Sequence, residues 1–326
     1  MDEAGGGAGM SHGSLGANIR FGLAKTALST LSLVWRAMSE RERRWLLHSS
    51  FANRSAPARS VAGFAQRALT VWKFPWTVYR GLYDLDCNGE TELLRRLASF
   101  MPRTVFDVGA NRGDWAMRAA TLLPGATIHA FEICVDTAAE LSKALAPLGR
   151  RAIVNNFGLA ETSGTVAVST FANSSVNTMT PLGKRDHGMG LHAAWGDANF
   201  VMARVETGDR YVEQADIERI NLLKVDVEGA EGRVLSGFTK TLCRGAIDVI
   251  QVEYNECAIW SRFLLRDLYE LLVPFGFRLG RLGPNGVAFK DYAVEDEDFC
   301  GPNYVAVHGR REDVIAALRC EPFDLE

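Results

Sequence analysis

The stretch 104–115, TVFDVGANRGDW, constrains the fold of this chain more than any other segment. A short run of β-branched and aromatic residues contains the acid Asp107, and two glycines follow four positions apart, Gly109 and Gly113. An apolar strand that passes through a glycine turn into a helix is typical of the first strand of an open α/β sheet, where ligands bind at the carboxyl ends of the strands. The stretch is therefore either a ligand-binding loop or a tight turn without a ligand.

Short apolar runs alternate with helical patterns from Glu90 onward. Strands are expected at 104–109, 127–133, 152–160, the start of 220–238, 247–256, the end of 266–283 and 303–309. Helices are expected at 90–100, 115–125 and 136–149, after the turn within 220–238, and at the start of 266–283. This alternation predicts an α/β fold with a doubly wound, mostly parallel, Rossmann-like sheet.

Composition divides the chain into three parts. Residues 1–17 are small and are expected to form a flexible tail, and 18–80 is expected to be a helical extension with four tryptophans. The extension contains eleven basic and two acidic residues, a net charge of +9, whereas the whole chain carries −3. Residues 81–326 are expected to form the main domain, in which the structureless insertion 171–209 is a lid or substrate loop.

The charge of the extension 18–80 leaves alternatives open. A helical extension that packs its tryptophans on the main domain is favoured over a peripheral arm on an anionic membrane surface. Nucleic acid is disfavoured as a partner, because the basic residues are not interleaved with a reading motif and the rest of the chain is acidic. The oligomeric state is left open.

The cysteines and the apolar segments indicate a cytoplasmic protein. The six cysteines are scattered without a C-x-x-C pair, so neither a disulfide framework nor a structural zinc site is expected. The amino terminus lacks the pattern of a secretory signal, and no segment reaches the roughly 20 apolar residues of a membrane-spanning helix. A reducing compartment is therefore expected, with a peripheral position at the inner membrane surface as the alternative.

The glycine loop does not match a dinucleotide-binding loop. Such a loop needs G-x-G-x-x-G, but Ala110 and Asn111 follow Gly109, so the second glycine is absent. Asp107 would repel a diphosphate but would attract a ligand that carries a sulfonium and an ammonium group, as S-adenosylmethionine does. Glu132 follows Asp107 closely enough to accept hydrogen bonds from ribose hydroxyls in this topology.

The expected S-adenosylmethionine site extends over several strand ends. The region 156–159, after the third strand, is expected to lie near the adenine. The residues assigned to the cofactor are Asp107, Gly109, Ala110, Asn111, Gly113, Glu132, Asn156, Gly158 and Asp226.

Four segments, VFDVGANRGDW, IHAFEI, NLLKVDVEGAE and VIQVEYNE, resemble in this order the FkbM-type S-adenosylmethionine-dependent methyltransferases. The resemblance covers about residues 92–308. It implies a class I methyltransferase fold and transfer of a methyl group to a hydroxyl oxygen, commonly of a sugar, glycan or polyketide-like small molecule. It does not identify the acceptor.

Methyl transfer to an alcohol requires a base or a metal ion, because a hydroxyl is a poor nucleophile. Asp226, at the end of the fourth strand, is the first candidate for the base, and Glu228 and Glu253 are the further catalytic candidates. Glu231 falls in the first turn of the next helix, where a carboxylate stabilises the helix dipole. Lys224 either extends to the sheet edge or pairs with Asp226 or Glu253.

A divalent cation such as Mg²⁺ is the alternative to a simple base. Asp226, Glu253 and Asn255 offer the oxygen ligands that hard cations prefer, and a bound ion would lower the pKa of the acceptor hydroxyl. A single set of three oxygens is weak evidence, so the base is favoured.

Polar side chains of the insertion are expected to bind the acceptor. Ser174 and Ser175 lie in a dense polar stretch, and His187 and His192 are placed to reach over the pocket. Asn255, after the fifth strand, joins them as a contact. Two other classes of protein stay open: a nicotinamide-dependent oxidoreductase, against which the missing glycine argues, and a non-catalytic binding module, against which the retained acids argue.

Overall fold

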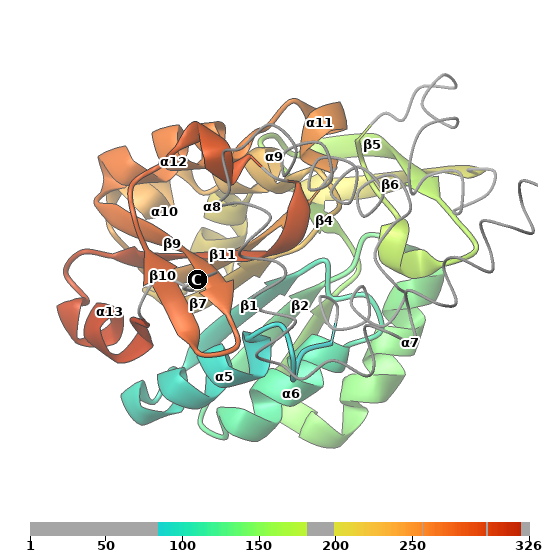
Figure 1. The fold of residues 1–326 in the computed structure, drawn as a ribbon. Coiled ribbons are helices and arrows are strands. Elements are labelled where there is room, and N and C mark those ends of the chain that lie inside the picture. Colours follow the sequence, from blue (N-terminus) through green and yellow to red (C-terminus); the bar gives the residue numbers. More distant parts are fainter. Residues whose placement is uncertain (1–83, 181–198, 256, 298, 321–326) are drawn as a thin grey trace, which may run out of the picture. The chain divides into compact units, whose positions relative to one another are not determined.

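The computed structural model describes residues 84–180, 199–255, 257–297 and 299–320 (Figure 1). They belong to a compact unit that spans Arg80–Phe323. The predicted tail 1–17 and the basic extension 18–80 lie outside the described residues, so the packing and membrane roles predicted for them stay predictions. None of the helices described is both long enough and apolar enough to cross a membrane.

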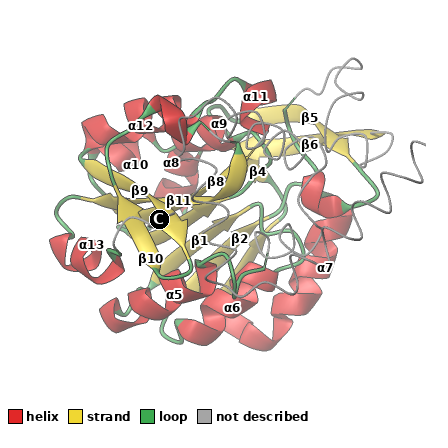
Figure 2. Cartoon of the chain, viewed as in Figure 1, coloured by secondary structure: helices red, strands yellow, loops and turns green. Residues whose placement is uncertain are grey.

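An eight-stranded sheet forms the centre of the fold, with the strand order β10-β9-β11-β8-β7-β1-β2-β3 (Figures 1 and 2). Neighbours from β8 to β3 pair in parallel, whereas β11 is antiparallel to both β8 and β9. The strands are β1 (Thr104–Val108), β2 (Thr127–Phe131), β3 (Ala152–Asn155), β7 (Ile220–Val225), β8 (Ile247–Asn255), β9 (Phe277–Gly283), β10 (Gly286–Phe289) and β11 (Cys300–His308).

Helices cover both faces of this sheet, as Figure 1 shows. On one face lie α5 (Glu90–Leu97), α6 (Asp114–Leu122), α7 (Val135–Leu145) and α13 (Glu312–Leu318). On the other lie α8 (Gly208–Gln214), α9 (Glu231–Ser236), α10 (Thr239–Cys243) and α12 (Leu265–Leu272), while the short α11 (Cys257–Ser261) follows β8. A separate apolar core fills each interface. The predicted doubly wound, mostly parallel α/β architecture is confirmed.

The strand order separates this sheet from the usual dinucleotide-binding one. A classic Rossmann sheet has the order 3-2-1-4-5-6. Here the antiparallel strand β11 lies between β8 and β9, so the strand order beyond β8 differs from the classic one. The strand order still reverses between β1 and β7, and the carboxyl ends of these two strands flank the crevice in which such sheets bind ligands.

Local sequence explains where the first elements begin and end. Helix α5 carries two acids in its first turn and two arginines in its last, which complements the helix dipole. Pro102 follows its end and prevents continuation. Helix α6 begins after Gly113, whose φ of 93° only glycine adopts readily, and a Cβ there would lie 2.8 Å from Leu141 Cδ1. Glycine at 113 is therefore required by the turn whether or not a ligand binds.

A second, three-stranded sheet corrects two sequence expectations. The strand expected at 152–160 breaks after Asn155, and Gly158–Leu159 (β4) pairs with β6 (Asn199–Glu206) instead. Strand β6 also pairs with β5 (Gly164–Thr170) over residues 199–205. The insertion predicted without regular structure thus contains a strand, because pairing with a distant partner outweighs its loop-like composition. Residues 181–198 of the insertion lie outside the described residues.

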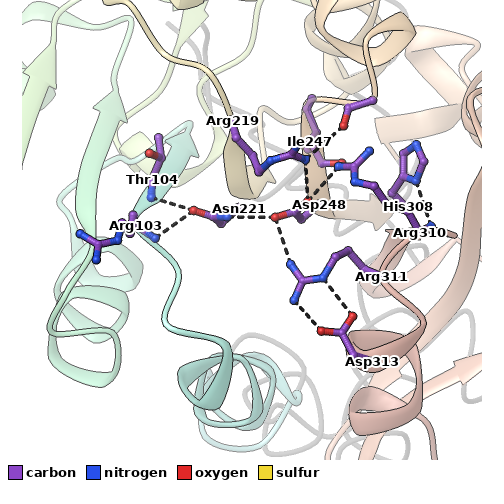
Figure 3. A network of polar contacts seen from close by, with 11 residues as sticks. Arg103, Thr104, Arg219, Asn221, Ile247, Asp248, His308, Arg310, Arg311 and Asp313 are labelled. Carbon is purple, nitrogen blue, oxygen red and sulfur yellow. Dashed lines mark hydrogen bonds and ion pairs between the residues drawn. The ribbon is translucent and has the colours of Figure 1, made fainter.

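A polar network ties the amino ends of the strands together (Figure 3). The Asp248 carboxylate, 2% exposed, accepts hydrogen bonds from Arg219 and Arg310 on Oδ1 and from Asn221 and Arg311 on Oδ2, at 2.8–3.1 Å. Asn221 Oδ1 accepts the backbone N–H groups at the start of β1. The network therefore joins β1, β7, β8 and the turn after β11 at the sheet edge opposite the crevice.

Candidate active site at the carboxyl ends of the strands

The loop after β1 is bound to the end of β2. The N–H groups of Gly109 and Ala110 both donate to the Phe131 carbonyl, at 3.0 and 2.9 Å, and the Asn111 N–H donates to Glu132 Oε2 at 3.0 Å. A Cβ at Gly109, where φ is 84°, would lie 1.8 Å from the carbonyl oxygen of Asp226. The loop amides are thus already occupied, which disfavours a phosphate-binding role.

Glu132, which follows β2 directly, holds the glycine loop. Its Oε1 accepts the Cys134 N–H at 2.8 Å, so each carboxylate oxygen accepts one backbone N–H group. Burial raises the pKa of Glu132, and these hydrogen bonds oppose the rise. Asn156 Nδ2 donates to the Glu132 carbonyl at 3.0 Å, and Gly158 packs closely on Ile133. The two residues predicted near the adenine therefore lie beside Glu132.

Asp107 is a fully buried carboxylate that the protein satisfies only in part. Among the described residues neither of its oxygens has a hydrogen-bond partner, although Lys224 Nζ lies 3.4 Å from Oδ1. Burial raises the pKa of Asp107 to about 6, and the charge of Lys224 limits the rise. Unpaired acceptors of this kind are costly unless a ligand or water supplies a donor.

Three carboxylates meet at the ends of β7 and β8. One oxygen of each of Asp226, Glu228 and Glu253 lies within 4.8 Å of the others. Lys224 Nζ pairs with Asp226 Oδ2 at 2.9 Å, and the Asp226 side chain is 33% exposed. Asn255 Nδ2 donates to Glu253 at 2.9 Å and to Glu228 at 3.3 Å. Two strand ends and one turn thus build an acidic group beside the glycine loop.

Burial and mutual repulsion raise the pKa values of the two glutamates in this acidic group. Burial, with the charge of Asp226 added, raises the pKa of Glu228 to about 8. The same two causes hold the pKa of Glu253 well above its ordinary value. Neighbouring carboxylates cannot all ionise in a site with little water. Glu228 is therefore mainly protonated at neutral pH, the pKa of Glu253 is shifted in the same direction, and Asp226 is the acid that is paired with a lysine.

Glu231 has the structural role predicted for it. It is the first residue of α9, and its Oε1 accepts the N–H groups of Val227 and Gly229 at 3.0 and 3.1 Å. The carboxylate thus closes the turn that carries Glu228, whose backbone φ of 53° is unusual for a residue with a side chain. Such a conformation persists only where surrounding contacts impose it.

The segment 173–180 crosses three of the strand ends. Ser174 Oγ donates to Asn111 Oδ1 at 3.0 Å, and Asn177 Nδ2 contacts Cys134 Sγ at 3.4 Å. Thr178 Oγ1 donates to the Glu228 carbonyl at 2.6 Å. The segment therefore connects the loop after β1, the end of β2 and the turn after β7.

Replacing Thr178 by valine is expected to lower the free energy of unfolding by about 1–3 kcal/mol, the usual cost of unpaired buried polar groups. Thr178 is 2% exposed, and its hydroxyl also accepts the Thr180 N–H at 2.9 Å, so two backbone groups lose their partner. Urea unfolding of Thr178→Val beside Thr178→Ser measures this. Equal stability of the two variants would show that the hydroxyl contributes nothing.

The residues predicted for the site fall into three groups. The structure brings together at the crevice Asp107, Gly109, Ala110, Asn111, Gly113, Glu132, Asn156, Gly158, Ser174, Asp226, Glu228, Glu253 and Asn255. Ser175 is exposed and bonds only to Asn173 among the contacts found for it. His187 and His192 lie outside the described residues.

Sequence reasoning missed two residues that hold the acids. Cys257 Sγ lies 3.3 Å from Glu228 Oε2, and Thr178 holds the Glu228 backbone. No local pattern marks Cys257. Thr178 lies in the polar stretch of the insertion that was expected to bind the acceptor, so its contact with the turn after β7 was not predicted. Asn255 was assigned to the acceptor, but its amide donates to the two glutamates and its Oδ1 accepts the Cys257 N–H at 2.8 Å.

Comparison with known proteins finds one domain family. The family described as the methyltransferase FkbM domain matches residues 107–279, which include the glycine loop and all three acids. Among curated proteins, the hexuronic acid methyltransferase AglP of Haloferax volcanii is 28% identical over 206 residues, which cover 62% of this chain and 76% of that protein.

Solved structures give more distant matches. The methyltransferase FkbM of Methylobacillus flagellatus aligns with 64% of this chain at 13% identity and a TM-score of 0.41, and this chain spans 43% of its length. An O-methyltransferase of Bacillus cereus in complex with SAH aligns with 66% of this chain and 78% of its own, at 10% identity and a TM-score of 0.35.

Proposed function

This chain belongs to the FkbM methyltransferase family, and from that premise we propose that it transfers a methyl group from S-adenosylmethionine to a hydroxyl oxygen of a sugar or glycan. The observation that carries the proposal is the position of Asp226, Glu228 and Glu253 beside the glycine loop. Both a cofactor site and a proton acceptor are needed for this reaction, and these neighbouring features support the presence of both.

The residues at the crevice fit S-adenosylmethionine. When bound, it supplies an electrophilic methyl group on a positively charged sulfur. Gly109 leaves room where any larger side chain would collide with Asp226, and the unpaired oxygens of Asp107 offer acceptors to a cationic ligand. The free lone pairs of Glu132 suit ribose hydroxyls. The occupied loop amides and the carboxylates argue against the diphosphate of NAD.

The acids have separate tasks in the proposed reaction. Asp226, partly exposed and paired with Lys224 on one oxygen, accepts the proton of the acceptor hydroxyl on the other. Glu228, whose raised pKa favours the protonated form, donates a hydrogen bond to a neighbouring oxygen of the acceptor, and Glu253 beside it helps to orient the acceptor. Asn255 holds the two glutamates in place.

The acceptor class follows from the relative and from the charge of the site. A hexuronic acid, the substrate in the name of the relative, offers both hydroxyl groups and a carboxylate for methylation. The Asp226 carboxylate would repel a carboxylate at the reacting position. A hydroxyl is therefore the favoured nucleophile, and a uronic acid carboxylate would lie away from Asp226.

A bound divalent cation is the second candidate for activating the hydroxyl. The convergence of three carboxylate oxygens within 4.8 Å favours it. The oxygen set differs from the one expected from the sequence, because Asn255 Oδ1 is used by Cys257 and Glu228 takes its place. Such an ion would be held by Asp226, Glu228 and Glu253 and would lower the pKa of the acceptor hydroxyl.

Calorimetry and product analysis test the function. We expect binding of S-adenosylhomocysteine and none of NAD. Radiolabelled S-adenosylmethionine, incubated with methyl glycosides of glucose and of glucuronic acid, should give a product that keeps its label in dilute alkali, because ethers survive and methyl esters hydrolyse. Release of labelled methanol would move the reaction to the carboxylate, and binding of NAD alone would overturn the proposal.

Asp107→Asn and Glu132→Gln are each expected to weaken binding of S-adenosylhomocysteine by about 1.5–3 kcal/mol, the scale for a hydrogen bond to a charged group. Both changes keep the size of the side chain and remove the charge. Glu312→Gln, at an exposed carboxylate of α13, is the matched control and should not change the affinity. Unchanged affinity in both site variants would contradict the cofactor assignment.

A further inference from the structure

A row of polar residues crosses the buried face of the sheet beneath the crevice. Asp107 of β1 is the register partner of Lys224 of β7, and Lys224 is the register partner of Gln251 of β8. All three are at most 5% exposed. The neighbouring row, with Val105, Leu222 and Val249, is apolar, as expected for a sheet covered by helices.

Lys224 contacts both halves of the site from this row. Its Nζ lies 2.9 Å from Asp226 Oδ2 and 3.4 Å from Asp107 Oδ1. The Trp115 ring of α6 covers the ammonium, with 5.6 Å between Nζ and the ring centroid. One nitrogen therefore links the carboxylate that precedes the glycine loop to the carboxylate that follows β7.

The row continues to a third carboxylate at the start of α5. Gln251 Nε2 donates to Glu90 Oε2 at 2.6 Å, and Asn88 Nδ2 donates to Glu90 Oε1 at 2.7 Å. Glu90 is 6% exposed. The ammonium of Lys224 thus lies among Glu90, Asp107 and Asp226, whose combined charge keeps it protonated and raises its pKa against the effect of burial.

This arrangement exceeds what a purely structural ion pair requires. A single carboxylate would neutralise one buried lysine, yet two contact it and a third stands behind Gln251. Burial raises the pKa of Glu90, so the excess rests on Asp107 and Asp226, which face a single ammonium group. Uncompensated buried charge is unfavourable, so this excess suits a site that receives a cationic ligand. The two oxygens of Asp107 without a hydrogen-bond partner lie in this same row.

We propose that Lys224 is a positioning residue that couples the two halves of the site, because its one ammonium group sets the position of Asp107 for the cofactor and of Asp226 for the acceptor proton. In this proposal Lys224 contacts neither the methyl group nor the acceptor hydroxyl. Lys224 holds one Asp226 oxygen, and the Asp226 side chain is one-third exposed, so the carboxylate stays accessible to an acceptor. The inference rests on the proposed function, because it assigns Asp107 to the cofactor and Asp226 to the acceptor.

The test uses Lys224→Met, which keeps the length of the side chain and removes the charge, and Lys224→Arg, which keeps the charge. Lys290→Met is the matched control, because Lys290 pairs with Asp296 at the same distance of 2.9 Å but is half-exposed and distant along the chain. Binding of S-adenosylhomocysteine is measured by calorimetry, and kcat is measured at saturating S-adenosylmethionine with the best methyl glycoside acceptor.

Lys224→Met is expected to lower both the affinity for S-adenosylhomocysteine and kcat by about tenfold or more, because Asp107 loses its ion pair and Asp226 loses a hydrogen bond from a charged group. Lys224→Arg should recover a large part of both, and Lys290→Met should change neither. A role confined to stability would lower the melting temperature and leave kcat at saturation unchanged. If Lys224→Met does not fold, the same change is made in a Glu90→Gln background, which removes one of the opposing buried charges, and is compared with Glu90→Gln alone.

The outcomes separate this inference from the proposed function. A wild-type protein that neither binds S-adenosylhomocysteine nor transfers methyl groups overturns the function itself. A wild-type protein that does both, beside a folded Lys224→Met variant that keeps either property within twofold, overturns only the coupling by Lys224. Equal losses in Lys224→Met and Lys224→Arg would also overturn it, because the ammonium charge would then not be what the site needs.

Discussion

Asp226→Asn is expected to slow methyl transfer by about 10²- to 10⁴-fold, the usual contribution of a positioned base. The amide cannot take up the proton of the acceptor hydroxyl. Its oxygen can still accept a hydrogen bond from Lys224, which lies 2.9 Å from Asp226 Oδ2, so the fold and the cofactor affinity should be retained. Single-turnover rates with labelled S-adenosylmethionine, beside calorimetry with S-adenosylhomocysteine, measure the two effects separately.

Three substitutions, and treatment with a chelator followed by Mg²⁺, decide how the acceptor hydroxyl is activated. Asp291→Asn, at an exposed residue, is the control and should keep the wild-type rate. A loss of rate in Glu253→Gln but not in Asp226→Asn would transfer the role of base to Glu253. Activity that disappears with a chelator and returns with Mg²⁺ would assign the three carboxylates to a cation instead.

Asp248→Asn is expected to lower the free energy of unfolding by about 3 kcal/mol without changing the affinity for S-adenosylhomocysteine. The carboxylate accepts hydrogen bonds from three arginines and from Asn221 (Figure 3). Breaking a buried ion pair costs about 3–5 kcal/mol, and the lower end applies because the arginines are partly exposed. Urea unfolding of the variant beside the wild type measures the loss.

The effect of Asp248 should also depend on pH. Burial alone would raise the pKa of Asp248, but the hydrogen bonds of Arg310 and Asn221 and the charges of Arg219 and Arg311 outweigh it and lower the pKa below its ordinary value. A lowered pKa in the folded state adds stability above the unfolded pKa of about 4, and this stability is lost as the pH falls further. The difference between wild type and Asp248→Asn should therefore shrink below about pH 4.

Asp313→Asn is the control for this network. Asp313 pairs with Arg311 at 2.9 Å but is 54% exposed, so its replacement should cost at most about 1 kcal/mol. A difference between wild type and Asp248→Asn that stays constant from pH 7 to pH 3 would show that the carboxylate charge does not stabilise the fold.

The main sheet could be predicted because its signal is local. Apolar runs such as 104–108 and 220–225 are buried on both faces by helices, and that burial requires the continuous hydrophobic pattern visible in the sequence. The strand β6 was not predicted. Its first residues are largely exposed, and it forms because β5 and β4 lie beside it, which no local pattern reports.

The acids of the candidate site were located from the sequence by one rule, that side chains at the carboxyl ends of parallel strands face a common crevice. That rule places Asp107, Asp226 and Glu253 but not the contacts between them. The mainly protonated state of Glu228 depends on burial and on the charge of Asp226 two residues away. The role of Asn255 depends on which neighbours its side-chain amide contacts, and in the structure this amide donates to Glu228 and Glu253.

The sequence by itself determined the α/β class, the glycine loop, the family resemblance and the strand ends that carry the acids, since each depends on residues close together in the chain. Only the tertiary structure decided that Lys224 pairs with both Asp107 and Asp226, and that Thr178 holds the turn of Glu228. Lys224 and Asp107 are 117 positions apart in the sequence, and Thr178 and Glu228 are 50 positions apart. Their formation depends on sheet register and chain crossing, which are set by the packing of the whole domain.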